Sequence, residues 1–132
     1  MKRNILVVED DFILRMVVKR SLKRSDLSIG AIFEAGNGRE ALGLLKKNDI
    51  NLLVTDINMP VMDGMEMLDR MHKIPLLSHI PVIVISAENS AERIRIFESR
   101  GYVFMRKPLS LEAMNKEIKK LDDDGYGYSL HG

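Results

Sequence analysis

The fold is decided by residues 51–64, which read NLLVTDINMPVMDG. They begin with a short continuous apolar run, as expected of a parallel strand that is covered on both faces. Asp56 follows where this run ends, and Pro60 excludes further sheet pairing after it. Asp63 and Gly64 then indicate the cap and first turn of a helix. The stretch therefore predicts a carboxylate at the carboxyl end of a buried strand, where open α/β sheets bind ligands.

On both sides of this stretch, apolar runs alternate with segments of helical periodicity. Further strands are expected at residues 5–8, 29–35, 80–85 and 102–105. Helices are expected at about residues 14–24, 38–45, 64–74, 89–98 and 111–121. Five alternations of strand and helix predict an α/β fold in which a doubly wound, five-stranded parallel sheet carries helices on both faces.

Apolar residues at helical spacing predict which side of each helix faces the core. In the third helix the expected inner positions are Met65, Leu68, Met71 and His72. In the fourth they are Ile94 and Phe97, and in the last, after a Ser110 cap, they are Leu111, Met114, Ile118 and Leu121.

The composition fits one domain without covalent cross-links. The chain has 132 residues and no cysteine, which excludes a disulfide framework and a thiolate site. Its formal net charge of +1 gives no argument for nucleic-acid binding. The basic start leads only into a short apolar run, so neither a signal peptide nor a membrane span is expected. We therefore expect a cytoplasmic protein. We expect the domain to cover residues 1–121, and the polar residues 122–132 to form a flexible tail.

The predicted sheet would gather polar residues that are far apart in the sequence. Every strand-to-helix loop of such a sheet emerges at the same edge. The residues expected there are Glu9, Asp10, Asp11, Asp56, Ser86 and Lys107. Carboxylates crowded at one edge repel one another unless a positive charge lies among them. This arrangement favours a divalent cation with oxygen ligands, such as Mg²⁺.

With this set of residues and the string MPVMDG at 59–64, the sequence resembles the response-regulator receiver domains of two-component signalling. The resemblance covers about residues 3–121. It implies a flavodoxin-like fold and a stand-alone regulator that is not an enzyme acting on other molecules. Asp56 would accept a phosphoryl group from the phosphohistidine of a histidine kinase or a histidine phosphotransfer protein. The histidines of this chain, His72, His79 and His131, are expected to be structural or solvated.

The resemblance also implies how the cation would be held. Asp10 and Asp56 would bind Mg²⁺ directly, Asn58 would contribute its backbone carbonyl, and Glu9 would act through water. Asp11 lies one position beyond the matching motif. It is expected to be a helix N-terminal acid and not a ligand.

Two further residues would contact the phosphoryl group. Lys107 would neutralise its charge and is followed by Pro108, for which the family implies a cis peptide bond. Ser86 would donate a hydrogen bond from its hydroxyl. Asn58 and Glu88 flank the expected position of attacking water, and by analogy with chemotaxis regulators they would make the aspartyl phosphate short-lived.

The output is expected to be a change in binding to another protein, through the face of the fourth helix, fifth strand and last helix. Ser86 would move toward the phosphoryl group, and Phe104, at the position of the family's aromatic switch, would rotate into the space behind it. The surface that would change is formed by Ala91, Arg95, Tyr102 and Arg106. Direct binding to nucleic acid or membrane is not expected.

Two other functions share parts of this pattern. A haloacid-dehalogenase-like phosphohydrolase also forms an aspartyl phosphate with Mg²⁺, but it needs an acid two residues after the nucleophile, where this chain has Asn58. An intermediate that hands the phosphoryl group on to a histidine phosphotransfer domain would have the same site. The sequence leaves that second alternative open.

Overall fold

The structure, a computed structural model, describes residues 2–87 and 90–123. Strand and helix alternate five times, as predicted. The elements in chain order are β1 (Arg3–Val8), α1 (Phe12–Arg24), β2 (Ile29–Ala35), α2 (Gly38–Lys47), β3 (Leu52–Thr55), α3 (Gly64–His72), β4 (Val82–Ser86), α4 (Ala91–Ser99), β5 (Val103–Arg106) and α5 (Leu111–Asp123).

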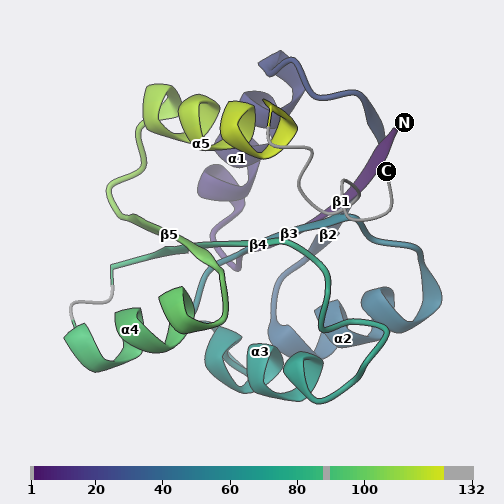
Figure 1. The fold of residues 1–132 in the computed structure, drawn as a ribbon, viewed down its shortest axis with the longest axis vertical. Coiled ribbons are helices and arrows are strands. Elements are labelled where there is room, and N and C mark those ends of the chain that lie inside the picture. Colours follow the sequence, from purple (N-terminus) through teal and green to yellow (C-terminus); the bar gives the residue numbers. More distant parts are fainter. Residues whose placement is uncertain (1, 88–89, 124–132) are drawn as a thin grey trace.

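The five strands form one parallel sheet in the order β2-β1-β3-β4-β5. Helices α1 and α5 cover one face, and α2, α3 and α4 cover the other (Figure 1). This is the doubly wound α/β fold that the sequence predicted. From β1 the chain passes to β2 on one side, and then returns to β3 on the other side. The carboxyl ends of β1 and β3 therefore form the switch point at which such sheets bind ligands.

Each face of the sheet buries its own apolar cluster. Side chains alternate along a strand, so Leu6 and Val8 of β1 pack toward α2, α3 and α4, whereas Ile5 and Val7 pack toward α1 and α5. The strands that are covered on both faces have no polar side, which explains their continuous apolar runs. The core thus fixes both ends of β1 and β3 relative to each other.

The inner face of α3 differs from the prediction. Its buried residues are Gly64, Met67, Leu68 and Met71. The assignment of His72 to the inner face was wrong, because His72 lies on the flank of this stripe and is exposed, while Met65 on the same flank is half-buried. In α5, Met114 and Ile118 are buried as predicted, and the side chains of Leu111 and Leu121 lie outside the described residues.

Several element limits also differ by a few residues. β4 begins at Val82 and includes Ser86, and β5 begins one residue after Tyr102. Helix α4 begins at Ala91 with Ser90 as its cap, and the predicted start at Asn89 lies outside the described residues. Helix α5 continues to Asp123, two residues beyond the predicted domain limit. Residues 124–132 of the predicted tail are not described.

Candidate functional site

Two acids occupy equivalent places at the ends of the two central strands. The register pairs Val8 of β1 with Thr55 of β3, so Glu9 and Asp56 each lie one residue beyond a neighbouring strand end. The Asp56 N–H donates to the Val8 carbonyl at 2.9 Å, which continues the ladder up to the acid. Both acids are almost fully buried. The backbone of the sheet therefore positions both carboxylates.

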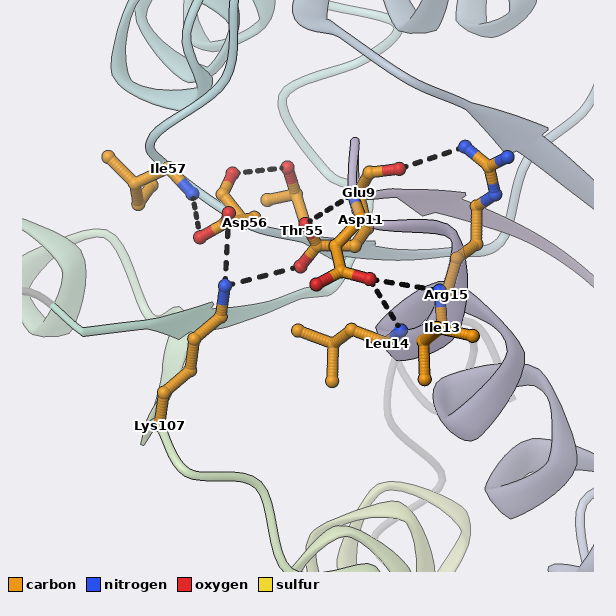
Figure 2. A network of polar contacts seen from close by, with 9 residues as sticks. All are labelled: Glu9, Asp11, Ile13, Leu14, Arg15, Thr55, Asp56, Ile57 and Lys107. Atoms are coloured by element: carbon orange, nitrogen blue, oxygen red, sulfur yellow. Dashed lines mark hydrogen bonds and ion pairs between the residues drawn. The ribbon is translucent and has the colours of Figure 1, made fainter.

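The two carboxylate oxygens of Asp56 have different neighbours (Figure 2). Oδ1 accepts a hydrogen bond from the Ile57 N–H at 2.7 Å, whereas Oδ2 lies 3.1 Å from Nζ of Lys107. Behind the loop, Gly64 donates to the Ile57 carbonyl at 2.7 Å, and a Cβ at Gly64 would lie 2.2 Å from the Asp56 carbonyl. Only glycine permits this close approach, which fixes the segment that carries Asp56.

Lys107 reaches the acids from the end of β5. Its Nζ lies 3.3 Å from Oε1 of Glu9 in addition to its contact with Asp56. Its backbone N–H donates to the Ser86 carbonyl at 2.9 Å, and its peptide bond to Pro108 is cis, as predicted. The lysine is thus anchored through β4 while its ammonium group lies between two carboxylates.

Burial and charge act against each other in this cluster. Burial raises the pKa of Glu9, and the negative charge of Asp56 raises it further, against the opposing effects of the Asp11 N–H and of Lys107. Burial alone would lower the pKa of Lys107, but the charges of Asp56 and Glu9 outweigh it and raise that pKa. Lys107 is therefore a firmly charged counterion, and Glu9 is a carboxylate held in an unfavourable environment.

The donor set fits a hard divalent cation. Carboxylate oxygens of Glu9, Asp10 and Asp56 lie within 4.8 Å of one another, and Asp10 is the exposed member. Mg²⁺ prefers oxygen ligands and retains several waters, so a site with one side open to solvent suits it. Asn58 follows Asp56 by two residues and its side chain is exposed.

Asp11 caps a helix, in line with the prediction that it is a helix N-terminal acid. Its Oδ1 accepts from the N–H groups of Ile13 at 2.9 Å and Leu14 at 3.2 Å, and it is the N-cap of α1. Its own N–H donates to Oε2 of Glu9 at 3.1 Å. Its side chain therefore caps the helix, and its backbone supports the buried acid beside it.

The residues expected to transmit a signal lie on β4, on β5 and on α4. Ser86 is fully buried at the end of β4, and Phe104 is half-buried with its ring 6.0 Å from that of Phe97. The expectation that Tyr102 contributes to the surface was wrong: its ring is buried in the cluster beneath α2, α3 and α4. Ala91, Arg95 and Arg106 are exposed as expected. Glu88 lies outside the described residues.

One residue of the site was missed by the sequence analysis. Arg15 of α1 donates from Nη1 to the backbone carbonyl of Glu9 at 2.9 Å (Figure 2). Its position one helical turn after the Asp11 cap was the available signal, because helical side chains point back toward the N-terminus. Its partner Glu34 on β2 depends on the strand register, which the sequence does not reveal.

Comparison with known proteins agrees with this geometry. A family model described as "Response regulator receiver domain" matches residues 5–119. The chain belongs to this family. Chemotaxis protein CheY-3 of Vibrio cholerae is 36% identical over 122 residues, which cover 89% of each chain. Chemotaxis protein CheY of Pseudomonas aeruginosa is 34% identical, covering 89% of this chain and 94% of the relative. The solved structure of CheY4 of Vibrio cholerae has a TM-score of 0.78 at 25% identity, covering 92% of this chain and 99% of that one.

Membership of the family settles the general function. This receiver domain acts in two-component signalling, where receiver domains interact with histidine kinases and downstream effectors and are generally signal switches, not enzymes. The family match supports this reading and gives no support to a phosphohydrolase. None of the helices in the described part of the chain is long and apolar enough to cross a membrane.

Proposed function

We propose that Asp56 accepts a phosphoryl group from the phosphohistidine of a histidine kinase or a histidine phosphotransfer protein. The observation that carries this proposal is the position of Asp56: it lies at the strand end, in the acid cluster, and within reach of Lys107. A carboxylate oxygen of Asp56 attacks phosphorus and forms an acyl phosphate. The bond between phosphorus and the imidazole nitrogen breaks, and its electron pair stays on that nitrogen. The ammonium group of Lys107 then faces the phosphoryl oxygens.

Mg²⁺ is part of the same proposal. When bound, it neutralises the acids and the phosphoryl oxygens. Asp10 and Asp56 would be its direct carboxylate ligands, Asn58 would offer its backbone carbonyl, and Glu9 would act through water. The chain would catalyse only its own phosphorylation and dephosphorylation. A cytoplasmic location is included in the proposal, since a chain without cysteine fits a reducing compartment.

Incubation with acetyl phosphate and Mg²⁺ tests the assignment directly. We expect intact mass spectrometry to detect one added phosphoryl group on the wild type and none on Asp56→Asn. Asp11→Asn is the matched control, because Asp11 belongs to the same edge but caps a helix; it should retain the label. Labelling of Asp56→Asn, or complete loss of labelling in Asp11→Asn alone, would contradict the proposal.

The same samples report the lifetime of the phosphoryl group. We propose that the exposed Asn58, together with Glu88, leaves room for the attacking water. The label should therefore decay within minutes at neutral pH after the donor is removed, and replacing Asn58 by leucine should slow the decay. A wild-type label that persists for hours would argue against this role.

We also propose that output leaves through α4, β5 and α5. The backbone hydrogen bond from Lys107 to Ser86 supports this route, because a movement of Lys107 toward a phosphoryl group would pass through this bond to the end of β4. Phe104 stacks on Phe97 of α4, so rotation of its ring would alter the packing of that helix and the exposed Ala91, Arg95 and Arg106.

Beryllofluoride, which mimics the bound phosphoryl group, tests this route by NMR. Amide chemical shifts should change around Asp56 and also from Phe104 to Arg106 and in α4. In Phe104→Leu the changes around Asp56 should persist while those in α4 diminish. Changes confined to the loops around Asp56 in the wild type would exclude this output route.

A further inference from the structure

Arg15 of α1 contacts both the loop after β1 and strand β2, beside the acid cluster. Besides its hydrogen bond to the Glu9 carbonyl, its Nε lies 3.1 Å from Oε1 of Glu34 on β2, an ion pair in which the N–H direction falls outside hydrogen-bond geometry. Lys19, one turn later in α1, contacts the other oxygen of Glu34 at 2.8 Å. Two cations of α1 thus hold Glu34, and of these two Arg15 also reaches the acid loop.

The carbonyl that Arg15 holds belongs to the peptide leading into Asp10. On its other side, the Glu9 N–H donates to the Ala35 carbonyl at 3.0 Å, so β2 holds this residue as well. The Asp10 side chain is exposed, and the orientation of this peptide sets the direction in which it leaves the backbone. If the peptide rotated, the carboxylate of Asp10 would move away from those of Glu9 and Asp56.

We propose that Arg15 is a positioning residue for the cation site, and that Glu34 acts on this site through Arg15. The inference rests on the proposed function, since it requires that the acids bind Mg²⁺. Arg15 touches neither the cation nor the phosphoryl group. Its planar guanidinium reaches the Glu9 carbonyl through Nη1 and Glu34 through Nε, two separate nitrogens held in one fixed geometry, which a lysine does not offer.

Charge and position predict opposite outcomes for this residue. A guanidinium near a cation site weakens cation binding by repulsion, so by charge alone its removal would tighten the binding of Mg²⁺. If Arg15 instead orients the peptide before Asp10, its removal weakens the binding. Outer partners that orient metal ligands typically contribute about 10–100-fold to metal affinity.

The experiment measures the dissociation constant of Mg²⁺ by amide chemical-shift titration for four variants. We expect Arg15→Met to bind about tenfold more weakly than wild type, and Arg15→Lys, which keeps the charge, to bind more weakly as well. Glu34→Gln should also bind more weakly than wild type, but less so than Arg15→Met, because it leaves the bond from Arg15 to the Glu9 carbonyl in place. Lys19→Met is the matched control: it breaks the other half of the Glu34 ion pair, leaves the Glu9 carbonyl bond intact, and should bind as wild type does.

A second readout separates positioning from loss of fold. The rate of phosphorylation by acetyl phosphate should be reduced in Arg15→Lys at low Mg²⁺ and should return to the wild-type rate at saturating Mg²⁺. Urea unfolding of the same variants identifies any that lose the fold, in which case the exposed Glu34→Gln carries the test. Repeating the titrations at high salt removes most long-range charge effects and should leave the differences in place.

Each contrary result has one meaning. The inference is overturned if Arg15→Met binds Mg²⁺ as tightly as wild type or more tightly. It is also overturned if Lys19→Met weakens Mg²⁺ binding as much as Glu34→Gln does. A phosphorylation rate that stays low at saturating Mg²⁺ overturns it too. If the wild type itself fails to bind Mg²⁺, the proposed function fails. If the wild type and the Arg15 variants bind Mg²⁺ equally well, only the inference about Arg15 fails.

Discussion

Two clusters, each of which pairs carboxylates with cationic side chains, lie on the same side of the molecule and differ in their surroundings. The strand-end cluster consists of Glu9, Asp56 and Lys107, with N–O distances of 3.3 and 3.1 Å. The edge cluster consists of Glu34, Arg15 and Lys19, with distances of 3.1 and 2.8 Å. The contacts are alike, but the carboxylate side chains are 5% and 4% exposed in the strand-end cluster and 36% exposed in the edge cluster.

The two clusters shift the pKa of their glutamates in opposite directions. The hydrogen bond from Lys19 lowers the pKa of Glu34, and together with the charges of Lys19 and Arg15 it outweighs burial, which acts in the opposite direction. Burial raises the pKa of Glu9 although Lys107 lies close to it. An ion pair near the surface therefore favours folding slightly, whereas the buried cluster holds charges that the rest of the fold must stabilise. Such a site gains most from a ligand that brings positive charge.

The largest difference should appear when the lysine of each cluster is removed. Lys107→Gln leaves buried carboxylates without a counterion, and we expect it to lower the free energy of unfolding by about 2 kcal/mol, less than the about 3–5 kcal/mol for a fully buried pair because Lys107 is partly exposed. Lys19→Gln should cost at most about 1 kcal/mol. Urea unfolding at pH 7 without divalent cations measures both values.

Addition of Mg²⁺ provides the control for this pair. It should restore much of the stability lost in Lys107→Gln, because the cation supplies the missing positive charge, and it should not rescue Lys19→Gln. Equal destabilisation by both substitutions would remove the distinction between the clusters.

A smaller effect, of opposite sign, is expected at the exposed member of the acid cluster. Asp10→Asn removes a negative charge next to Glu9 and Asp56, and should raise the metal-free free energy of unfolding by about 0.5–1 kcal/mol, a typical value for partly exposed charges. It should also reduce stabilisation by Mg²⁺. Asp11→Asn is the control, since asparagine caps helices as well as aspartate does. A less stable Asp10→Asn would show that internal partners hold the acids.

The contrast between the clusters also marks what the sequence could predict. Asp56 and Lys107 could be placed at one edge because the alternation of strands and helices fixes which loops meet there. The ion pair between Arg15 and Glu34 could not be predicted, because it depends on how α1 packs against β2. His72 was misplaced because periodicity gives the direction of an apolar stripe, while the exposure of a residue on its flank depends on the neighbouring element. Tyr102 was misplaced because the burial of a residue just before a strand depends on how that segment packs in the folded chain.

The smallest expected effects concern pH, and here the two clusters should respond with opposite signs. The pKa of Glu34 is lowered in the folded chain, so its stabilising contribution is present above its unfolded value of 4.5 and is lost as the pH falls through the folded value. The pKa of Glu9 is raised, so its ionisation is unfavourable to folding at neutral pH, and this penalty disappears as the pH falls below 4.5.

Metal-free urea unfolding of Glu34→Gln and Glu9→Gln between pH 3 and pH 8 therefore sharpens the comparison. At pH 7 we expect Glu34→Gln to be less stable than wild type by a few tenths of a kcal/mol, since the pair is exposed, and Glu9→Gln to be more stable, since glutamine can still accept the Asp11 N–H without a charge. Both differences should vanish at acid pH. Lys107 stays charged over this range because its pKa is raised, so it does not confuse the result. If Glu9→Gln were less stable than wild type at pH 7, attraction to Lys107 would outweigh burial, and the two clusters would be of one kind.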